Sequence, residues 1–207
     1  MWGLVENNEI KKIINKPKGL VIGDTRHSRN IFSFRWSNEE REAIGIYEVV
    51  FDNSNKKDEA YYNNTNQSFN FADGKVTASF GTATAKRLND EDAKDEDGNN
   101  VLDEDGNQVI NYGLKTEKKR IIKSQASGYL TKTDWYVIKA TDVESYSVPS
   151  AIKTYRADVR TASNDMEAKI DACTTVDELK TLYEYVNTGT EENRVMERPL
   201  GEFPKEI

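Results

Sequence analysis

Short apolar runs, broken every few residues by turn formers, dominate the first third of the chain. Residues 2–14 contain two such runs on either side of an Asn7-Asn8 turn, and this pattern predicts two short strands. Residues 30–36 read NIFSFRW, with an aromatic side chain at every second position from Phe32 onward. This period of two predicts a strand with one buried face.

The next segment predicts one helical turn between two strands. Ser37 and Glu40 have the spacing of a capping box, and Gly45 follows at a distance that would end the helical turn. The run IYEVVF, residues 46–51, then resumes as a strand. Downstream, Asp73-Gly74 separates SFNFA from KVTASF, which is the strongest signal in the chain for a β-hairpin.

An eight-residue unit is written twice between Asp95 and Ile110, as DEDGNNVL and DEDGNQVI. Asp-Gly pairs favour turns, because glycine adopts the left-handed backbone conformation without strain. The two apolar residues that close each unit are expected to be strand pieces. The repeat therefore predicts short hairpins within an acidic segment.

After Gly113 the apolar residues recur every three or four positions, which predicts helices. One helix is expected from Leu114 to about Tyr129. A longer one is expected to begin at Pro149 and to run for about six to seven turns. Thr175 and Glu178 form a second capping box. The helix that it opens is expected to turn four residues inward and to end near Gly189: Leu179, Leu182, Tyr183 and Val186.

These elements together predict an α+β fold. A β-rich module is expected over residues 1–112, with the acidic hairpins at 90–110 inside it. A helical module follows over residues 113–189, and an extended tail over 190–207. The tail has too little apolar content to fold alone, so we expect it to dock on something or to stay mobile.

The charge of the chain is concentrated in one place. The net charge is −7, yet residues 90–105 alone carry −8 and the rest sums to +1. Nucleic-acid binding requires clustered basic residues, so this balance argues against nucleic acid as a partner. The basic residues between Lys115 and Lys123 are expected on the outer face of a helix, where they neutralise the acidic segment.

Export and membrane insertion are not expected from the sequence. The single cysteine, Cys173, excludes an internal disulfide. The N-terminal residues lack a charged region followed by an apolar stretch, and no run approaches eighteen apolar residues. We therefore expect a soluble protein that does not contact a membrane, and the sequons at Asn63 and Asn66 carry no weight.

The acidic repeat raises the question of calcium. An EF-hand needs acidic residues at the first, third and fifth positions before its glycine, and neither Gly98 nor Gly106 has them. A looser calcium site from Asp95, Asp97, Asp103 and Asp105 stays open if two turns lie side by side. The interpretation we favour is a solvated, self-repelling flap without a metal ion or cofactor.

Catalysis is not expected. His27 is the only histidine, and no nucleophile elbow or oxyanion signature accompanies it. Its neighbours Arg26 and Arg29 are expected to form a loop surface that could face an acidic neighbour. Carboxylate pairs that hydrolyse glycans are an alternative, but such chemistry needs a shaped cleft.

Aromatic residues in a polar chain favour protein contacts, because large rings with a polar handle are enriched at interfaces. Trp36 and Trp135 are expected in the cores of the two modules. Four other residues are expected at interfaces: Tyr61, Tyr62, Arg194 and Phe203.

The second half of the chain carries several motifs in a fixed order. They are Thr133-Asp134-Trp135-Tyr136-Val137-Ile138-Lys139, Val148-Pro149, Tyr155-Arg156 with Val159-Arg160, Ser163-Asn164, and Thr174-Thr175-Val176-Asp177-Glu178-Leu179. This order resembles a helical module at the C-termini of tailed-bacteriophage tail fibre and tail-fibre-assembly-like proteins. WSNEEREAIGIYEVVFD, residues 36–52, is similar to an element of small phage tail proteins. The acidic repeat has no counterpart in this pattern, and Lys139 stands where arginine is commoner.

The resemblance implies a non-enzymatic structural component of a phage tail, which acts by docking to other tail proteins, with copies of itself as a further partner. Such a chain is made in the bacterial cytoplasm and resides in the virion. Two alternatives stay open. One is an assembly chaperone that leaves the fibre, and the other is a receptor-binding module that contacts host surface glycan.

Overall fold

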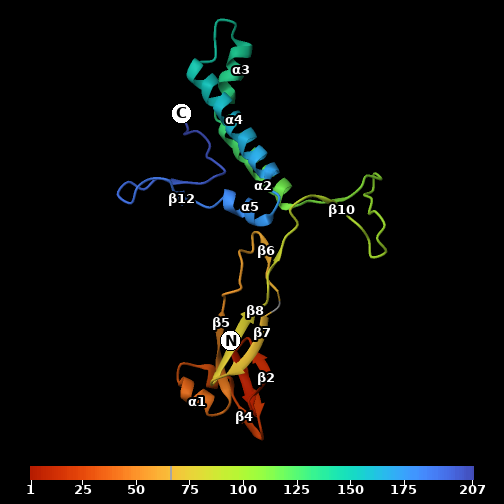
Figure 1. Ribbon diagram of the computed structural model, residues 1–207, viewed down its shortest axis with the longest axis vertical. Coiled ribbons are helices and arrows are strands. Elements are labelled where there is room, and N and C mark those ends of the chain that lie inside the picture. The colour runs from red at the N-terminus through yellow and green to blue at the C-terminus, as the bar shows by residue number, and fades with distance from the viewer. Residues whose placement is uncertain (66) are drawn as a thin grey trace. The chain divides into compact units, whose positions relative to one another are not determined.

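The computed structural model describes residues 1–65 and 67–207, so the sequon at Asn66 lies outside the described residues. Strands form the first part of the chain and helices the second, which confirms the α+β fold (Figure 1). The chain divides into two compact units, residues 1–84 and 85–207. The acidic repeat thus belongs with the helices and not with the β-rich module in which its pattern predicts it.

The first unit is built on a five-stranded curled sheet in the order β2-β1-β5-β8-β7. Its strands are β1 (Trp2–Glu6), β2 (Glu9–Ile14), β5 (Ile46–Asp52), β7 (Gln67–Ala72) and β8 (Lys75–Phe80). The β5–β8 pairing is parallel and the other pairings are antiparallel. Leu4 and Val5 enter different buried clusters, because successive side chains of a strand point to opposite faces.

Both predicted hairpins of this sheet are confirmed. Asn7 and Asn8 join β1 to β2 with φ angles of 53° and 62°, and Asp73 and Gly74 join β7 to β8 with φ angles of 51° and 69°. Positive φ at both central residues is the hairpin geometry that matches the twist of the flanking strands. Asparagine, aspartate and glycine tolerate this geometry best.

The segment around residue 31 departs from the prediction. Instead of a strand, the structure has a 3-10 helix, η1 (Arg29–Phe32), whose N-terminus is capped by the Ser28 side chain. Local capping and the burial of Ile31 override the alternating pattern. The capping box predicted downstream is confirmed, since Ser37 and Glu40 open the helix α1 (Asn38–Glu42). Gly45 ends it at φ 80°, where a Cβ atom would lie 2.5 Å from the Val5 carbonyl oxygen.

Two further small strand pairs are β3 (Leu20–Ile22) with β4 (Thr25–His27), and β6 (Tyr62–Asn63) with β9 (Thr84–Ala85).

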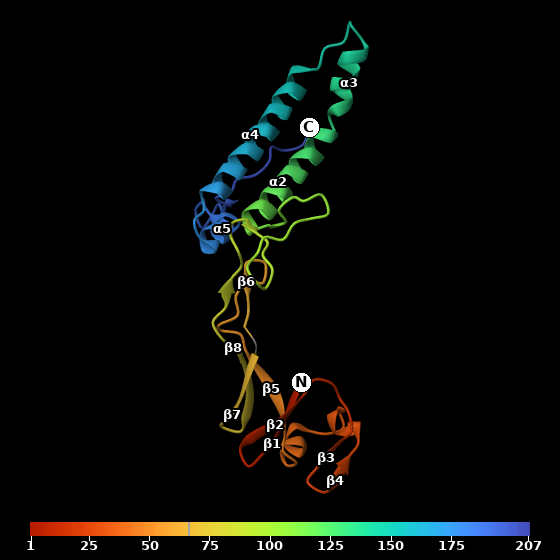
Figure 2. The same cartoon turned by 90° about the vertical axis from the view of Figure 1, so that its right-hand side faces the viewer.

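The second unit is organised around two long helices that run side by side (Figure 2). Its helices are α2 (Leu114–Thr131), α3 (Asp134–Asp142), α4 (Ser150–Ala172) and α5 (Val176–Leu182). The long helix that the sequence predicts after Pro149 and the capping box of Thr175 with Glu178 are both confirmed. In the described part of the chain, no helix is both long and apolar enough to cross a membrane.

The C-terminal segment differs from the prediction. The helix α5 ends at Leu182, and Val186 lies exposed in β12 (Val186–Asn187) rather than inward on a helix. Gly189 lies in the hairpin between β12 and β13 (Met196–Glu197), away from the helix end. The tail then docks on its own unit, where Leu200 is fully buried. Its backbone N–H donates to the Leu182 carbonyl oxygen at 2.9 Å.

Candidate functional site

Arg156 joins three helices of the second unit. It lies on α4 and its Nη1 donates to the Leu130 carbonyl oxygen at 2.8 Å, near the end of α2, and to Thr133 Oγ1 at 2.7 Å. The same nitrogen lies 2.8 Å from a carboxylate oxygen of Asp134, the first residue of α3. The final carbonyl groups of a helix lack partners within it, so Arg156 satisfies one of them while holding the next helix in place. The Thr-Asp and Tyr-Arg motifs of the sequence therefore meet at one junction.

The helix α3 turns its apolar side chains outward. None of its nine residues is buried, and Trp135 and Ile138 are 51% and 61% exposed. Val137 is exposed as well. We call Trp135, Val137 and Ile138 the α3 face. The prediction that Trp135 is a core residue is therefore wrong, because α3 is anchored through Thr133 and Asp134 instead of through its large apolar side chains.

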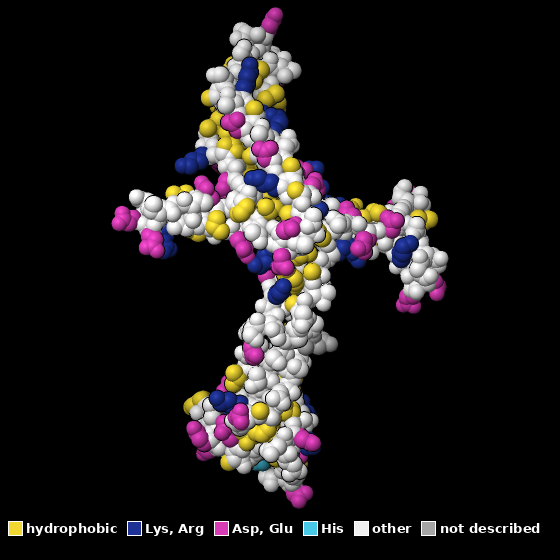
Figure 3. All heavy atoms as spheres, viewed as in Figure 1, with side chains coloured by type: hydrophobic (Ala, Val, Ile, Leu, Met, Phe, Trp, Pro, Cys, Tyr) yellow, Lys and Arg dark blue, Asp and Glu magenta, His cyan; other side chains and the backbone are white. Residues whose placement is uncertain are grey.

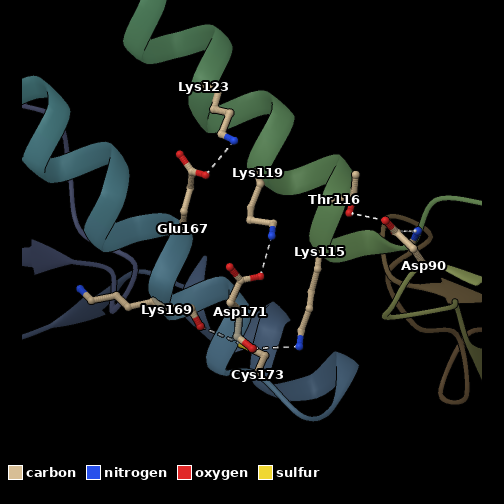
Figure 4. Close-up of polar contacts among 10 residues, drawn as sticks. Asp90, Lys115, Thr116, Lys119, Lys123, Glu167, Lys169, Asp171 and Cys173 are labelled. Atoms are coloured by element: carbon tan, nitrogen blue, oxygen red, sulfur yellow. Dashed lines mark hydrogen bonds and ion pairs between the residues drawn. The ribbon is translucent and has the colours of Figure 1, made fainter.

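The basic residues of α2 are used to hold α4, as Figure 4 shows. Lys119 pairs with the Asp171 carboxylate at 2.7 Å, and Lys123 pairs with Glu167 at 3.2 Å. Lys115 donates to the Asp171 carbonyl oxygen at 2.9 Å. Toward the acidic segment, Lys119 and Arg120 act only on its first residue, where they lower the pKa of Asp90, whereas the ion-pair partners of Lys119 and Lys123 lie on α4.

Arg120 and Lys118 lie over aromatic rings. The Arg120 guanidinium stands 3.9 Å from the centre of the Tyr112 ring, and the Lys118 ammonium stands 4.9 Å from that of Tyr183. Every basic residue between Lys115 and Lys123 thus has a partner in its own chain. A surface of this kind favours helix packing over phosphate binding.

The start of α2 is completed by residues far away in the sequence. Asp90 accepts a hydrogen bond from the Gly113 backbone N–H at 2.7 Å and one from Thr116 Oγ1 at 2.9 Å (Figure 4). The hydrogen bond from Gly113, with that from Thr116 and nearby cations, lowers the pKa of Asp90 below its usual value. Asp90 therefore supplies the N-terminal cap that α2 lacks locally.

The acidic repeat folds as two small hairpins on a short stem of β10 (Glu91–Asp92) and β11 (Ile110–Asn111). Three backbone groups spaced eight residues apart close a ring at its centre. The backbone N–H of Ala93 donates to the carbonyl oxygen of Val109. In the same way, Val109 donates to Val101 and Val101 donates to Ala93, all at 2.8–2.9 Å. The eight-residue period thus sets a three-way junction, and Figure 3 shows acidic side chains at the outer ends of this segment.

Asp95 and Asp103 hold the two turns. Each carboxylate accepts backbone N–H groups two and four residues later, at 3.0 and 2.8 Å in both turns. The N–H of Asn99 lowers the pKa of Asp95, and the N–H of Asn107 lowers the pKa of Asp103. The calcium site considered from Asp95, Asp97, Asp103 and Asp105 does not assemble. Among residues 1–65 and 67–207, no group of three or more carboxylate, histidine or cysteine side chains is placed to bind a metal ion.

Three of the four predicted interface residues are occupied within the chain. Tyr61 and Tyr62 are only 5% and 4% exposed, and the backbone N–H groups of both donate to the Asp58 carbonyl oxygen. Phe203 packs on Tyr129, with ring centres 5.0 Å apart. Arg194 is exposed in the loop between β12 and β13. The two tyrosines are therefore not surface contacts in this chain, whereas Arg194 keeps its predicted position.

His27 lies within a strand pair, and Cys173 is buried in the helical unit. His27 lies on β4 opposite Leu20. The Cys173 thiol is buried and donates to the Lys169 carbonyl oxygen at 3.4 Å. Burial, followed by the nearby Glu178 carboxylate, raises the pKa of this thiol. A buried thiol held in this way is poorly suited to act as a nucleophile.

No protein-family model, no curated protein and no solved structure matches the chain. The interpretation of the surfaces therefore rests on their own geometry. Sequence reasoning missed the roles of Arg156 and Asp90, whose partners lie more than twenty residues away. One local signal for Arg156 was present. It directly follows Tyr155, which lies on the buried side of an amphipathic helix.

Proposed function

We propose that this chain is a non-enzymatic structural component of a bacteriophage tail that acts by docking to other tail proteins. The proposal depends on one observation: within a single motif, some residues anchor α3 and others form an exposed apolar surface. Thr133 and Asp134 fix α3 to Arg156, whereas the next apolar residues form the exposed α3 face. The motif that resembles phage tail proteins therefore builds a rigid support for a contact surface.

The physical character of the α3 face supports docking. An exposed tryptophan contributes strongly to protein interfaces, because its large ring buries much apolar area, and flanking aliphatic side chains help to exclude water. The anchoring of α3 through Arg156 lowers the ordering cost further. We infer that a neighbouring tail protein covers Trp135, Val137 and Ile138 in the assembled particle.

Quantitative mass spectrometry of purified phage particles tests the role. A structural component is expected at a fixed ratio to the other tail proteins. An assembly chaperone would instead be present in infected cells and absent from the purified particles. Strong binding of the isolated protein to host surface polysaccharide would favour the receptor-binding alternative.

Substitutions on α3 test the mechanism. Trp135→Ala with Ile138→Ala is expected to reduce incorporation into particles at least tenfold, since it removes the central apolar contacts. Ile121→Ala is a matched control, because Ile121 is a similarly exposed apolar residue on α2. Both proteins are expected to keep the thermal stability of the wild type. Equal incorporation of the double variant and the control would contradict the role of the α3 face.

A further inference from the structure

A fully exposed phenylalanine stands in the loop between η1 and α1. Phe34 is 95% exposed, although its neighbours Ile31 and Phe32 are directed inward. Phe32 packs on Trp2 with ring centres 4.6 Å apart. Among the described residues, no other large apolar side chain is as exposed as Phe34, so a partner at this site would bury nearly the whole ring.

The loop that carries Phe34 is held rigidly by Arg41. The Arg41 guanidinium donates to the carbonyl oxygens of Ser33 and Trp36 on either side of Phe34, at 3.3 and 2.8 Å, and to that of Ile31 at 3.3 Å. The Ser33 hydroxyl donates in turn to the Asn30 carbonyl oxygen at 2.7 Å. A ring displayed on a fixed loop loses little freedom when it binds, so this geometry favours recognition.

The surroundings of Phe34 in the sequence are basic. Arg26, Arg29 and Arg35 are exposed, and none of them forms an ion pair within the described residues. Residues 25–36 contain no acidic side chain. The partner of this surface is therefore expected to combine negative charge with an apolar group. We call residues 26–36 the Phe34 loop.

The acidic repeat has these complementary properties. Its four outer acids, Glu96, Asp97, Glu104 and Asp105, are exposed and form no ion pair among the described residues. Leu102, between the two turns, is 57% exposed. Asp95 and Asp103 are committed to the turns, so the outer acids remain available to an arginine. We call residues 95–105 the acidic double turn.

We propose that the Phe34 loop of one copy docks on the acidic double turn of a second copy, with Phe34 against Leu102 and the arginines facing the outer acids. Such a contact joins two different surfaces, so it is heterologous and leaves one free surface at each end of the pair. Charge complementarity sets the partner and the register, and Phe34 supplies the apolar anchor. This inference does not depend on the proposed tail role.

A mixing experiment with two altered proteins tests the contact. One carries Arg29→Glu and Arg35→Glu in the Phe34 loop, and the other carries Leu102→Asp in the acidic double turn, so the two altered surfaces are both acidic and do not complement each other. Each retains one intact surface, so each alone is expected to be monomeric in sedimentation velocity, while an equimolar mixture forms a heterodimer that grows no further. The wild-type chain associates with rising concentration through both surfaces. Association is expected to weaken several-fold between 0.1 and 1 M salt, as the screening length falls from about 10 to 3 Å.

Phe34→Ala tests the anchor, and it is expected to weaken association at least tenfold. Trp135→Ala, which removes an exposed ring on α3, is the control and is expected to leave this association unchanged. A wild-type chain that remains monomeric at all concentrations would overturn the proposal. So would a mixture that contains only monomers, the result expected if the contact forms within one chain.

Discussion

At the scale of single residues, Arg156 holds the junction of α2, α3 and α4 through three contacts. Its loss removes the donor that the Leu130 carbonyl group and the buried Thr133 hydroxyl share, and it leaves the Asp134 carboxylate without its ion-pair partner. Arg156→Ala is expected to lower the free energy of unfolding by about 1.5–3 kcal/mol, the range for hydrogen bonds to a charged group. Chemical denaturation followed by circular dichroism measures this change.

Arg160→Ala is the matched control for Arg156→Ala. Arg160 lies one turn later on the same helix and is exposed, and among the described residues its guanidinium donates only to the Arg156 carbonyl oxygen, at 3.1 Å. Its replacement is expected to change the free energy of unfolding by no more than about 0.5 kcal/mol. Equal effects of the two substitutions would show that Arg156 does not hold the junction.

Gly113, which directly precedes α2, and Gly128 within α2 make a contrasting pair. A Cβ atom at Gly113 would lie 2.4 Å from the Asn89 carbonyl oxygen, whereas one at Gly128 would meet nothing within 4 Å. Gly113→Ala is therefore expected to destabilise the protein by about 1–3 kcal/mol through crowding. Gly128→Ala is expected to stabilise it by about 0.5–1 kcal/mol, since alanine favours helices. Thermal unfolding of both variants measures these changes. If the two substitutions change the stability in the same direction, the packing described at Gly113 is contradicted.

The residues that sequence alone placed correctly are those with nearby partners. Ser37 and Thr175 cap helices through residues three positions away, and Asp73-Gly74 forms its turn from two neighbours. Asp90 and Arg156 instead act across 23 residues or more, and no local spacing marks such a pair. Side-chain partners at long range follow from the tertiary packing, which the sequence pattern does not specify.

At the scale of elements, the two acidic turns allow a matched comparison of adjacent aspartates. The Asp95 carboxylate accepts two backbone N–H groups of its turn, whereas Asp97 takes part through its own backbone N–H. Asp95→Ala is expected to open the first turn and to increase amide hydrogen exchange at Asn99, while Asp97→Ala leaves that exchange unchanged. Nuclear magnetic resonance measures both, and increased exchange in the Asp97 variant would contradict this role of Asp95.

Acid is expected to loosen the same elements. Hydrogen bonds from backbone N–H groups lower the pKa values of Asp90, Asp95 and Asp103 in the folded chain. Their contribution to stability is therefore present above the unfolded pKa of about 3.9 and is lost as the pH falls through the lower folded values. Replacing all three with asparagine is expected to flatten the fall of the melting temperature below pH 4. If the melting temperature falls equally steeply with pH in the variant and the wild type, the three aspartates do not stabilise the fold in this way.

The element predictions failed where a short pattern fits two structures. The alternation at residues 30–36 is equally consistent with a 3-10 helix that buries Ile31 and exposes Phe34, and capping by Ser28 decides between them. Similarly, the apolar content of α3 predicts burial, but anchoring by Arg156 leaves Trp135 outside. Sequence patterns report how apolar a segment is, and they do not report which surface of it is covered.

At the scale of the whole molecule, the α+β class follows from the change of apolar period near Gly113. The boundary between the units does not follow from this change of period. It lies at Thr84, because the backbone carbonyl groups of Arg87 and Leu88 accept hydrogen bonds from the first N–H groups of α2, at 2.9 and 3.1 Å. These bonds attach the acidic repeat to the helices, and a composition that looks β-rich gives no sign of them.

The division at Thr84 predicts that the two units fold independently. Fragments 1–84 and 85–207 each contain complete buried clusters, such as that of Val5, Val49 and Val76 in the first and that of Ala126, Tyr155 and Val159 in the second. Each fragment is expected to unfold cooperatively, and their far-ultraviolet circular dichroism spectra are expected to sum to that of the full chain. A cut after residue 112 is the control. It separates Asp90 from Gly113, and the fragment 113–207 is therefore expected to melt at a lower temperature than 85–207. Equal melting temperatures would mean that the acidic repeat adds nothing to the helical unit.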